Sequence, residues 1–288
     1  MPAAAQPDAV LVWFRNDIRI HEQAALSAAL ADGRPVRALY FICDRQWDLH
    51  HVAPLRRWYV LESVRELGQE LARLGVPLDI IDAGDFAAVP PLFGSYLSRQ
   101  SVRKVFVGRE YPRNELDRDR ACALEAASRQ VEVQGFDHGV LVPPRLLSTG
   151  QGRPYTVFTP YRRAWQKWLD SHGPAPLATP RRRRGVDAIS FAGDGAIDAA
   201  LARLSVASAL SSHWQCGEKA ARRQLKGFVD RALTDYQRHR DFPAIGGTSM
   251  LSAALSAGTL SVAECWHLAR VGLQQPSQRA GAECWIGE

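Results

Sequence analysis

The 288-residue chain lacks the patterns that mark metalloproteins and disulfide-bonded proteins. Its five cysteines are odd in number and show no C-x-x-C spacing: Cys43, Cys122, Cys216, Cys265 and Cys284. Scattered cysteines of this kind argue against a disulfide framework and against a zinc site, and they indicate reduced thiols. The eight histidines include no H-E-x-x-H motif. We therefore expect no metal site.

Signals for membranes and for secretion are also missing. No apolar run approaches the length of a membrane span. The N-terminal residues, Met-Pro-Ala-Ala-Ala-Gln-Pro-Asp, lack the basic start and the apolar centre of a secretory signal. We expect a cytoplasmic protein that does not contact membranes.

Common catalytic fingerprints are absent as well. The turn after the first apolar run, Arg15–Arg19, contains no glycine, although a dinucleotide-binding fingerprint needs glycines there so that the backbone can approach the pyrophosphate. The chain also has no G-x-x-x-x-G-K-[ST] and no G-x-S-x-G motif. We assign no catalytic side chain. We expect Arg15, Asp17 and Arg19 to form ion pairs between domains.

The chain carries a surplus of positive charge. A net charge of +6 and a pI near 9.3 favour polyanionic partners such as nucleic acid. Four of the positive charges stand together at Arg181–Arg184, which we interpret as a solvated linker. The charge permits DNA binding without establishing it.

The first half of the chain alternates strand-like and helix-like segments. Continuous apolar runs are typical of strands that are buried on both faces. The pattern predicts strands at Ala9–Phe14, Pro35–Cys43, Pro77–Asp82, Lys104–Gly108 and Val131–Phe136. It predicts helices at Glu22–Ala31, Leu55–Leu74, Phe86–Arg99 and Asn114–Arg129. Five such alternations predict an α/β fold, with a Rossmann-like five-stranded parallel sheet and flanking helices in residues 1–136.

The second half has a different pattern. Proline and glycine punctuate residues 137–212, which predicts a long interdomain connector with one aromatic helix near Pro160–Asp170. Beyond it every predicted element is helical: Glu218–Leu233, Ser252–Ala257 and Val262–Val271, the last with a capping box at Ser261 and Glu264. We expect an all-helical unit over residues 213–288.

The segment from Tyr236 to Ser261 is the most informative stretch. A basic and aromatic run leads through Pro243 and two glycines to a cluster of hydroxyl groups that opens a helix. Hydroxyl groups and free backbone N–H groups at a helix start suit a phosphate. Serine and threonine are also common helix caps, and the spacing alone favours that simpler role for Thr248 and Ser249.

Three segments resemble the DNA photolyase/cryptochrome family. Val12–Arg19 (VWFRNDIR) is similar to its opening signature, Arg153–Tyr161 (RPYTVFTPY) to its connector, and the segment 236–261 to the start of its flavin-binding domain. The resemblance covers nearly the whole chain and is closest to bacterial cyclobutane-pyrimidine-dimer photolyases with a folate antenna. It implies an antenna domain at 1–136, the connector at 137–212, and the first part of an all-helical FAD-binding domain at 213–288.

The resemblance also implies roles for single residues. Arg240 would lie at the DNA backbone, and Glu288 would face the pyrimidine dimer. Asn114 and Glu115 would bind the pterin of the antenna chromophore, methenyltetrahydrofolate. The contacts to FAD and its phosphates would come from Tyr236, Thr248, Ser249, Met250, Leu251, Ser252 and Trp285.

Simpler roles are open for several of these residues. Asn114 is a good helix cap, and Glu115 suits the solvated first turn of a helix. Tyr236 and Trp285 have the character of core aromatics. These alternatives need no ligand.

The activity implied by the resemblance is that of a deoxyribodipyrimidine photolyase, in which light drives electron transfer from reduced FAD to cyclobutane pyrimidine dimers in DNA. Family members are generally monomers. The family pattern continues beyond Glu288, so we expect a truncated form that is inactive alone and binds FAD weakly or not at all. The alternatives are a cryptochrome-type blue-light receptor, or an antenna or nucleotide-binding remnant without repair activity.

Overall fold

The computed structural model describes residues 8–207 and 211–288. The expectation for the extreme N-terminus, and residues 208–210 of the expected connector, lie outside the described residues. Five parallel strands form one sheet in the order β3-β2-β1-β4-β5. They are β1 (Ala9–Phe14), β2 (Val36–Ile42), β3 (Leu78–Asp82), β4 (Val102–Gly108) and β5 (Glu132–Phe136). The predicted five-stranded parallel sheet is confirmed.

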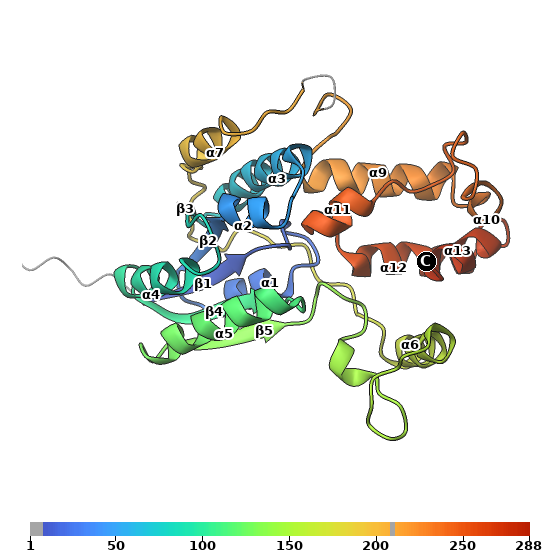
Figure 1. Ribbon diagram of the computed structural model, residues 1–288, viewed down its shortest axis with the longest axis horizontal. Coiled ribbons are helices and arrows are strands. Elements are labelled where there is room, and N and C mark those ends of the chain that lie inside the picture. The colour runs from blue at the N-terminus through green and yellow to red at the C-terminus, as the bar shows by residue number, and fades with distance from the viewer. Residues whose placement is uncertain (1–7, 208–210) are drawn as a thin grey trace, which may run out of the picture.

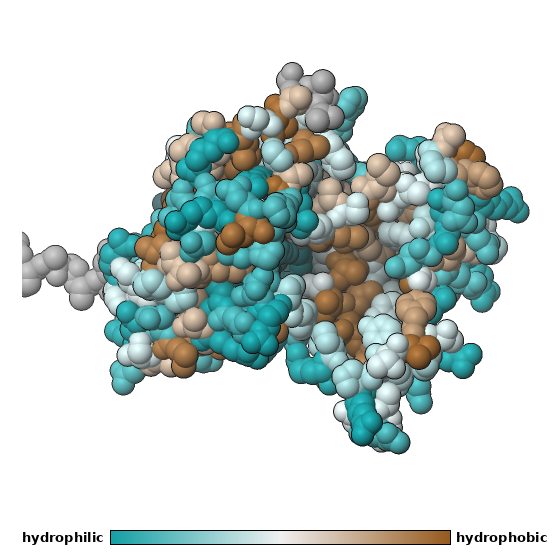
Figure 2. Space-filling view, in the orientation of Figure 1, coloured by the Kyte–Doolittle hydropathy of each residue, from teal (hydrophilic) through white to brown (hydrophobic). Residues whose placement is uncertain are grey.

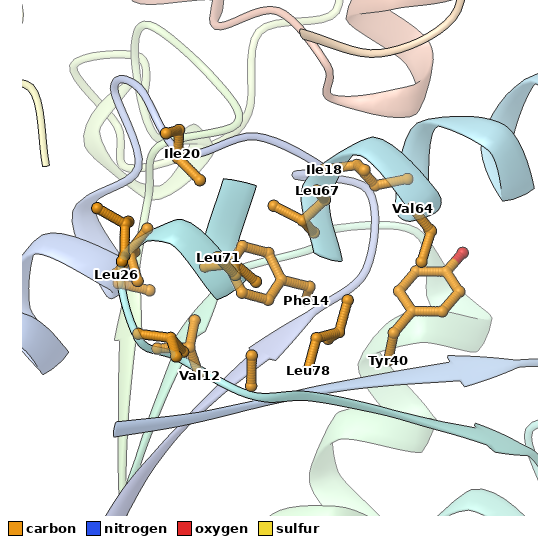
Figure 3. Packing of buried hydrophobic residues seen from close by; sticks show 14 of the residues in the cluster. Val12, Phe14, Ile18, Ile20, Leu26, Tyr40, Val64, Leu67, Leu71 and Leu78 are labelled. Atoms are coloured by element: carbon orange, nitrogen blue, oxygen red, sulfur yellow. The ribbon is translucent and has the colours of Figure 1, made fainter. Parts of the chain in front are cut away.

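Helices cover both faces of this sheet (Figure 1). They are α1 (Ala24–Ala31), α3 (Pro54–Arg73), α4 (Val89–Arg99) and α5 (Arg113–Ala127), with the short α2 (Asp44–Leu49) after β2. Alternate residues of β1 belong to two separate apolar clusters, with Phe14 in one and Trp13 in the other. The first cluster is closed by α1 and α3, and the second by α4 and α5. Figure 3 shows Phe14 in the first cluster beside Leu67 and Leu71 of α3.

Residues 137–207 contain more structure than the sequence predicts. Beyond the single-turn helix η1 (Pro144–Leu146), the expected aromatic helix is present as α6 (Phe158–His172). A further helix, α7 (Asp194–Leu201), was not predicted. Its Ile197 is fully buried in the cluster beneath α3. We call residues 8–136 the α/β part. The connector thus contributes the Ile197 side chain to the core of the α/β part.

The helical part, residues 211–288, contains α9 (Glu218–Arg231), α10 (Tyr236–His239), α11 (Ser252–Ala257), α12 (Val262–Leu273) and α13 (Arg279–Ile286). No strand occurs among its residues, as predicted. Buried Leu225 and Phe228 of α9 pack against the other helices in two small clusters. In Figure 2, apolar residues also gather in the hollow between this part and the α/β part.

The predicted capping box at the start of α12 forms only by half. The Ser261 hydroxyl accepts a hydrogen bond from the Ala263 N–H at 3.1 Å. Glu264 pairs instead with Arg222 of α9, with 2.8 Å between Oε1 and Nε. The Glu264 carboxylate thus links α12 to α9 through this ion pair. It does not make the hydrogen bond back to the Ser261 N–H that a complete capping box would contain.

Ion pairs between domains were expected from the turn after β1, and this prediction is largely wrong. Arg15 pairs with Glu110 (3.6 Å) and Asp119 (3.4 Å), within the α/β part. Asp17 pairs with His138, just beyond β5, at 3.1 Å. Arg19 does reach the helical part, but its partner there is a backbone carbonyl.

Glu218, at the first turn of α9, is one of the carboxylates that join the two parts, beside Glu66 and Glu70 of α3, which bond to Lys219 of α9. Glu218 is 7% exposed and accepts hydrogen bonds from the backbone N–H groups of Ile20 (2.8 Å) and His21 (2.9 Å). The His21 ring Nδ1 lies 2.9 Å from the same carboxylate. The buried N–H of Ile20 and the part-buried N–H of His21, which follow the turn, are therefore satisfied by a side chain from the helical part.

Within the described ranges 8–207 and 211–288, none of the helices combines the length and the apolar content needed to cross a lipid bilayer.

Candidate functional site

The hydroxyl cluster lies in an exposed turn that is fixed from below. Leu251 is buried among Leu225 and Leu260, which anchors the turn to the helical part. The Gln224 side chain of α9 donates to the carbonyl oxygens of Ser249 (3.1 Å) and Met250 (2.8 Å). Met250 has a positive φ of 53° and is 65% exposed. The backbone of the turn is therefore held by Gln224 and Leu251, while the side chains of Thr248, Met250 and Ser252 are exposed.

The hydroxyl groups of this turn do not cap the following helix. The N-cap of α11 is Leu251, and no side chain accepts a hydrogen bond from its first turn. Among the described residues, the hydroxyl groups of Thr248, Ser249 and Ser252 have no hydrogen-bond partner. The simple capping role is thus wrong for Thr248 and Ser249. Three hydroxyl groups and uncapped N–H groups together form a donor set that suits phosphate oxygens.

Tyr236 and Trp285 lie against the same ring, Phe228 of α9. The Phe228 centroid is 5.5 Å from that of Tyr236 and 4.9 Å from that of Trp285. Burial raises the pKa of Tyr236, which is 7% exposed, so this residue is a core aromatic in the described chain. Trp285 is only half-buried, and it also contacts the cluster that contains Leu251. Trp285 therefore connects the aromatic cluster to the hydroxyl-bearing turn.

Arg240 and Glu288 form an ion pair with each other. The Arg240 Nη1 donates to Glu288 Oε1, and the Arg240 Nε lies 3.4 Å from Asp241 Oδ1. Glu288 is exposed and Arg240 is partly exposed. The structure brings both predicted DNA-contacting residues together, and the Glu288 carboxylate occupies the place beside the Arg240 guanidinium.

Asn114 and Glu115 lie on the α/β part, in the first turn of α5. The N-cap of this helix is Pro112, so Asn114 is not a cap. Its amide nitrogen lies 3.1 Å from His50 Nε2 at the end of α2. Glu115 lines a cleft of about 170 Å³ with Tyr40, Trp47 and Arg57 among its other walls.

This cleft lies at the carboxyl ends of β1 and β2. The chain runs outward from β1 through β2 to β3 on one side, and to β4 and β5 on the other, so the strand order reverses at β1. Ligands of open α/β sheets bind at this kind of position. Arg118 borders the cleft, paired with Glu110 (2.6 Å) and stacked 4.5 Å from the Phe86 ring centroid. Because Glu110 and Asp119 (2.8 Å) already neutralise this guanidinium, Arg118 contributes polar lining to the cleft and no free positive charge.

The predicted residues thus form two groups on different parts of the chain. Tyr236, Arg240, the turn 248–252 and Trp285 with Glu288 belong to the helical part, whereas Asn114 and Glu115 belong to the α/β part. The sequence did not point to Gln224 or His50, because a glutamine in a helix and a histidine in a short turn carry no motif. Only the folded chain shows that Gln224 contacts the hydroxyl-bearing turn and that His50 contacts Asn114.

Comparisons with known proteins bear on both groups. A family model described as DNA photolyase matches residues 10–181, which include the sheet, its helices and α6. The chain belongs to the DNA photolyase family. The family predicted from three separated motifs is confirmed.

Similarity to curated and solved DNA photolyases extends over the helical part as well. The chain is 36% identical over 281 residues to the deoxyribodipyrimidine photo-lyase of Escherichia coli K12, covering 96% of this chain and 57% of the relative. It is 32% identical over 288 residues to that of Vibrio cholerae, covering 96% and 58%. A class III photolyase structure from Agrobacterium tumefaciens matches with a TM-score of 0.78 and 26% identity, covering 100% and 59%. The chain therefore spans less than two thirds of the length of these DNA photolyases.

Proposed function

We propose that this chain supplies the antenna domain and the first part of the flavin- and DNA-binding domain of a deoxyribodipyrimidine photolyase. The observation that carries the proposal is the turn 248–252, with three hydroxyl groups free of internal partners, in a chain 36% identical to an enzyme of that name. The corresponding domains are 1–136 for the antenna, 137–212 for the connector and 213–288 for the flavin-binding fragment.

The residues of the helical part fit FAD. The hydroxyl groups of Thr248, Ser249 and Ser252 would bind the pyrophosphate, while buried Leu251 holds the turn in place. Trp285 and Tyr236, which both pack on Phe228, would border the flavin. When bound and reduced, FAD supplies the electron that splits the cyclobutane ring.

The Arg240–Glu288 pair would recognise damaged DNA. A guanidinium next to a phosphate is favourable in charge and in geometry, and the exposed pair with Glu288 can be exchanged for a phosphate at little cost. The freed Glu288 would then face the dimer. Extrusion of a dimer from the duplex is easier than that of a normal base, because the lesion is already poorly stacked.

The α/β part would hold the antenna chromophore, methenyltetrahydrofolate. The cleft beside Glu115 lies where α/β sheets bind ligands, and Asn114 with His50 stands at its edge. A carboxylate and an amide together can pair with the donors and acceptors of a pterin ring. A chromophore-binding module without repair activity is the second candidate function, because this cleft needs nothing from the helical part.

A chimeric enzyme tests the first proposal. The matched N-terminal region of the E. coli relative is replaced by this chain, and light-dependent loss of cyclobutane dimers from irradiated oligothymidylate is measured. We expect bound flavin and light-dependent repair, and we expect both to be lost in Thr248→Ala/Ser249→Ala/Ser252→Ala. A folded chimera that retains flavin without repair would favour the light-receptor alternative. A folded chimera without flavin would contradict the proposal.

Two further predictions accompany this function. The protein is expected to act in the cytoplasm, where DNA is accessible, and to be a monomer. Sedimentation of the purified chain at several concentrations measures the second directly.

A further inference from the structure

The segment that leads into α6 and through most of it carries basic side chains, and the first acidic residue after Asp137 is Asp170, near the end of α6. Residues 138–169 carry Arg145, Arg153, Arg162, Arg163 and Lys167 and no acidic side chain. Arg145 is paired with Asp137 at 2.7 Å. Among the residues that the structure describes, the other four cations form no ion pair. A group of unpaired cations of this kind suits a polyanion.

The same segment exposes aromatic rings. One face of α6 packs through Trp165 and Leu169 against Trp266 of α12. Toward the helix start the aromatic stripe continues beyond this packing, so that Phe158 is 64% exposed and Tyr161 is 37% exposed. Tyr155 lies edge-on to Tyr161, with 6.1 Å between the ring centroids. Exposed rings among unpaired cations are the combination by which proteins bind single-stranded nucleic acid.

This surface adjoins the residues to which DNA contacts were assigned above. A Cβ at Gly287 would lie 2.7 Å from the Arg162 guanidinium, so Arg162 stands next to the backbone that leads to Glu288. Ile286 packs in the same cluster as Trp165. In Figure 1, α6 lies on the side of the molecule where the chain ends, below α12 and α13. The basic surface is therefore continuous with the Arg240–Glu288 pair.

We propose that residues 153–167, the α6 surface, form a second DNA-contacting surface. Arg153, Arg162, Arg163 and Lys167 neutralise backbone phosphates, and the rings of Phe158 and Tyr161 stack on bases that lose their partners when a dimer leaves the duplex. This inference rests on the proposed function, and it assigns the unpaired strand to a part of the chain outside the flavin-binding fragment.

Fluorescence anisotropy of the whole chain with labelled oligothymidylate, measured over a range of salt concentrations, tests this surface. In R162A/R163A we expect the slope of log affinity against log salt to fall in magnitude by about 1.4, because each phosphate contact with a single strand contributes about 0.7. R162K/R163K should keep the slope. In F158A and Y161A the affinity should fall by about fivefold or more at unchanged slope. The matched control is R182A/R184A, which removes the charges of two exposed arginines outside the α6 surface.

The outcomes separate this inference from the proposed function. Equal loss in R162A/R163A and R182A/R184A would show an effect of net charge alone and would contradict the inference. Unchanged affinity in F158A and Y161A, with circular dichroism like that of the wild type, would show that these rings do not stack on bases and would also contradict the inference. DNA binding with a normal salt slope in R162A/R163A overturns the inference alone. Failure of the unaltered chain to bind any oligothymidylate contradicts both proposals.

Discussion

The Arg19 guanidinium donates a hydrogen bond from Nη1 to the carbonyl oxygen of Gly258 at 3.0 Å, across 239 positions of the sequence. The backbone of Gly258 lies so close to the turn after β1 that a Cβ there would overlap the carbonyl of Asn16. In dinucleotide-binding folds this turn approaches a pyrophosphate. Here its Ile20 N–H instead binds Glu218, a carboxylate of the same chain.

Gly258 should be sensitive to any side chain. Its φ of +70° is strained for other residues, and the space for a Cβ is occupied by backbone. We expect Gly258→Ala to lower the free energy of unfolding by about 2 kcal/mol or more, measured by urea denaturation. Gly150→Ala is the control, because nothing lies within 4 Å of a Cβ there. Equal, small effects of both changes would show that the close approach is not maintained in solution.

Glu218 should contribute to stability through the hydrogen bonds that its two carboxylate oxygens accept. Glu218→Gln replaces one carboxylate oxygen by an NH₂ group that faces a backbone donor. We expect a loss of about 2 kcal/mol in the free energy of unfolding. Glu283→Gln removes an exposed pair with Arg279 on α13 and should change stability by less than about 0.5 kcal/mol. A Glu218→Gln protein as stable as the Glu283→Gln control would refute this assignment.

Asp17 makes stability depend on pH. Burial alone would raise the pKa of Asp17, but the hydrogen bond from His138, the nearby Arg15 guanidinium and the hydrogen bond from the Arg15 backbone N–H hold it well below its ordinary value. Stability contributed by a carboxylate with a depressed pKa is present above the unfolded pKa of about 3.9 and is lost as pH falls below it. The difference in unfolding free energy between wild type and Asp17→Asn should therefore be largest near neutral pH and shrink below about pH 4. A difference that stays constant from pH 7 to pH 3 would contradict this assignment.

Glu115 should affect the antenna cleft alone. We expect Glu115→Gln to weaken binding of methenyltetrahydrofolate about tenfold, as for loss of one charge-assisted hydrogen bond. The chromophore's absorbance in the purified chain measures this. The control is Asp117→Asn on the same helix, whose carboxylate pairs with Arg113 at 2.7 Å and does not line the cleft. Equal binding by both variants would remove Glu115 from the chromophore site.

The sheet was predictable because its central strands β1, β2 and β4 contain runs of buried apolar residues and alternate with helix-like segments. Ala9–Phe14 was predicted with the bounds that the structure has, since every residue of it is buried. The helix α2 was missed because none of its residues is buried, so it has no apolar periodicity. α13 was missed because its buried residues are Gly281 and Ala282, and Gly281 serves a close approach to the Leu233 carbonyl that no sequence pattern reveals.

The candidate site was predictable in part for a similar reason. The turn 248–252 has a local signature of hydroxyl groups before a helix. By contrast, Glu218, which joins the two parts of the chain and lies outside the candidate site, has no signature, because an acidic residue in the first turn of a helix is ordinary. Its partner Ile20 lies 198 positions away, so only the folded chain shows the contact.

The most direct test of the central claim is a titration of the isotope-labelled chain with FAD to millimolar concentration, followed by the backbone amide resonances. NMR detects weak binding, which is expected of this chain alone. We expect the largest shifts on residues 249–254, with a smaller shift at the Trp285 indole N–H. Shifts confined to other parts of the chain, or no shift in that turn at millimolar FAD, would contradict the central claim.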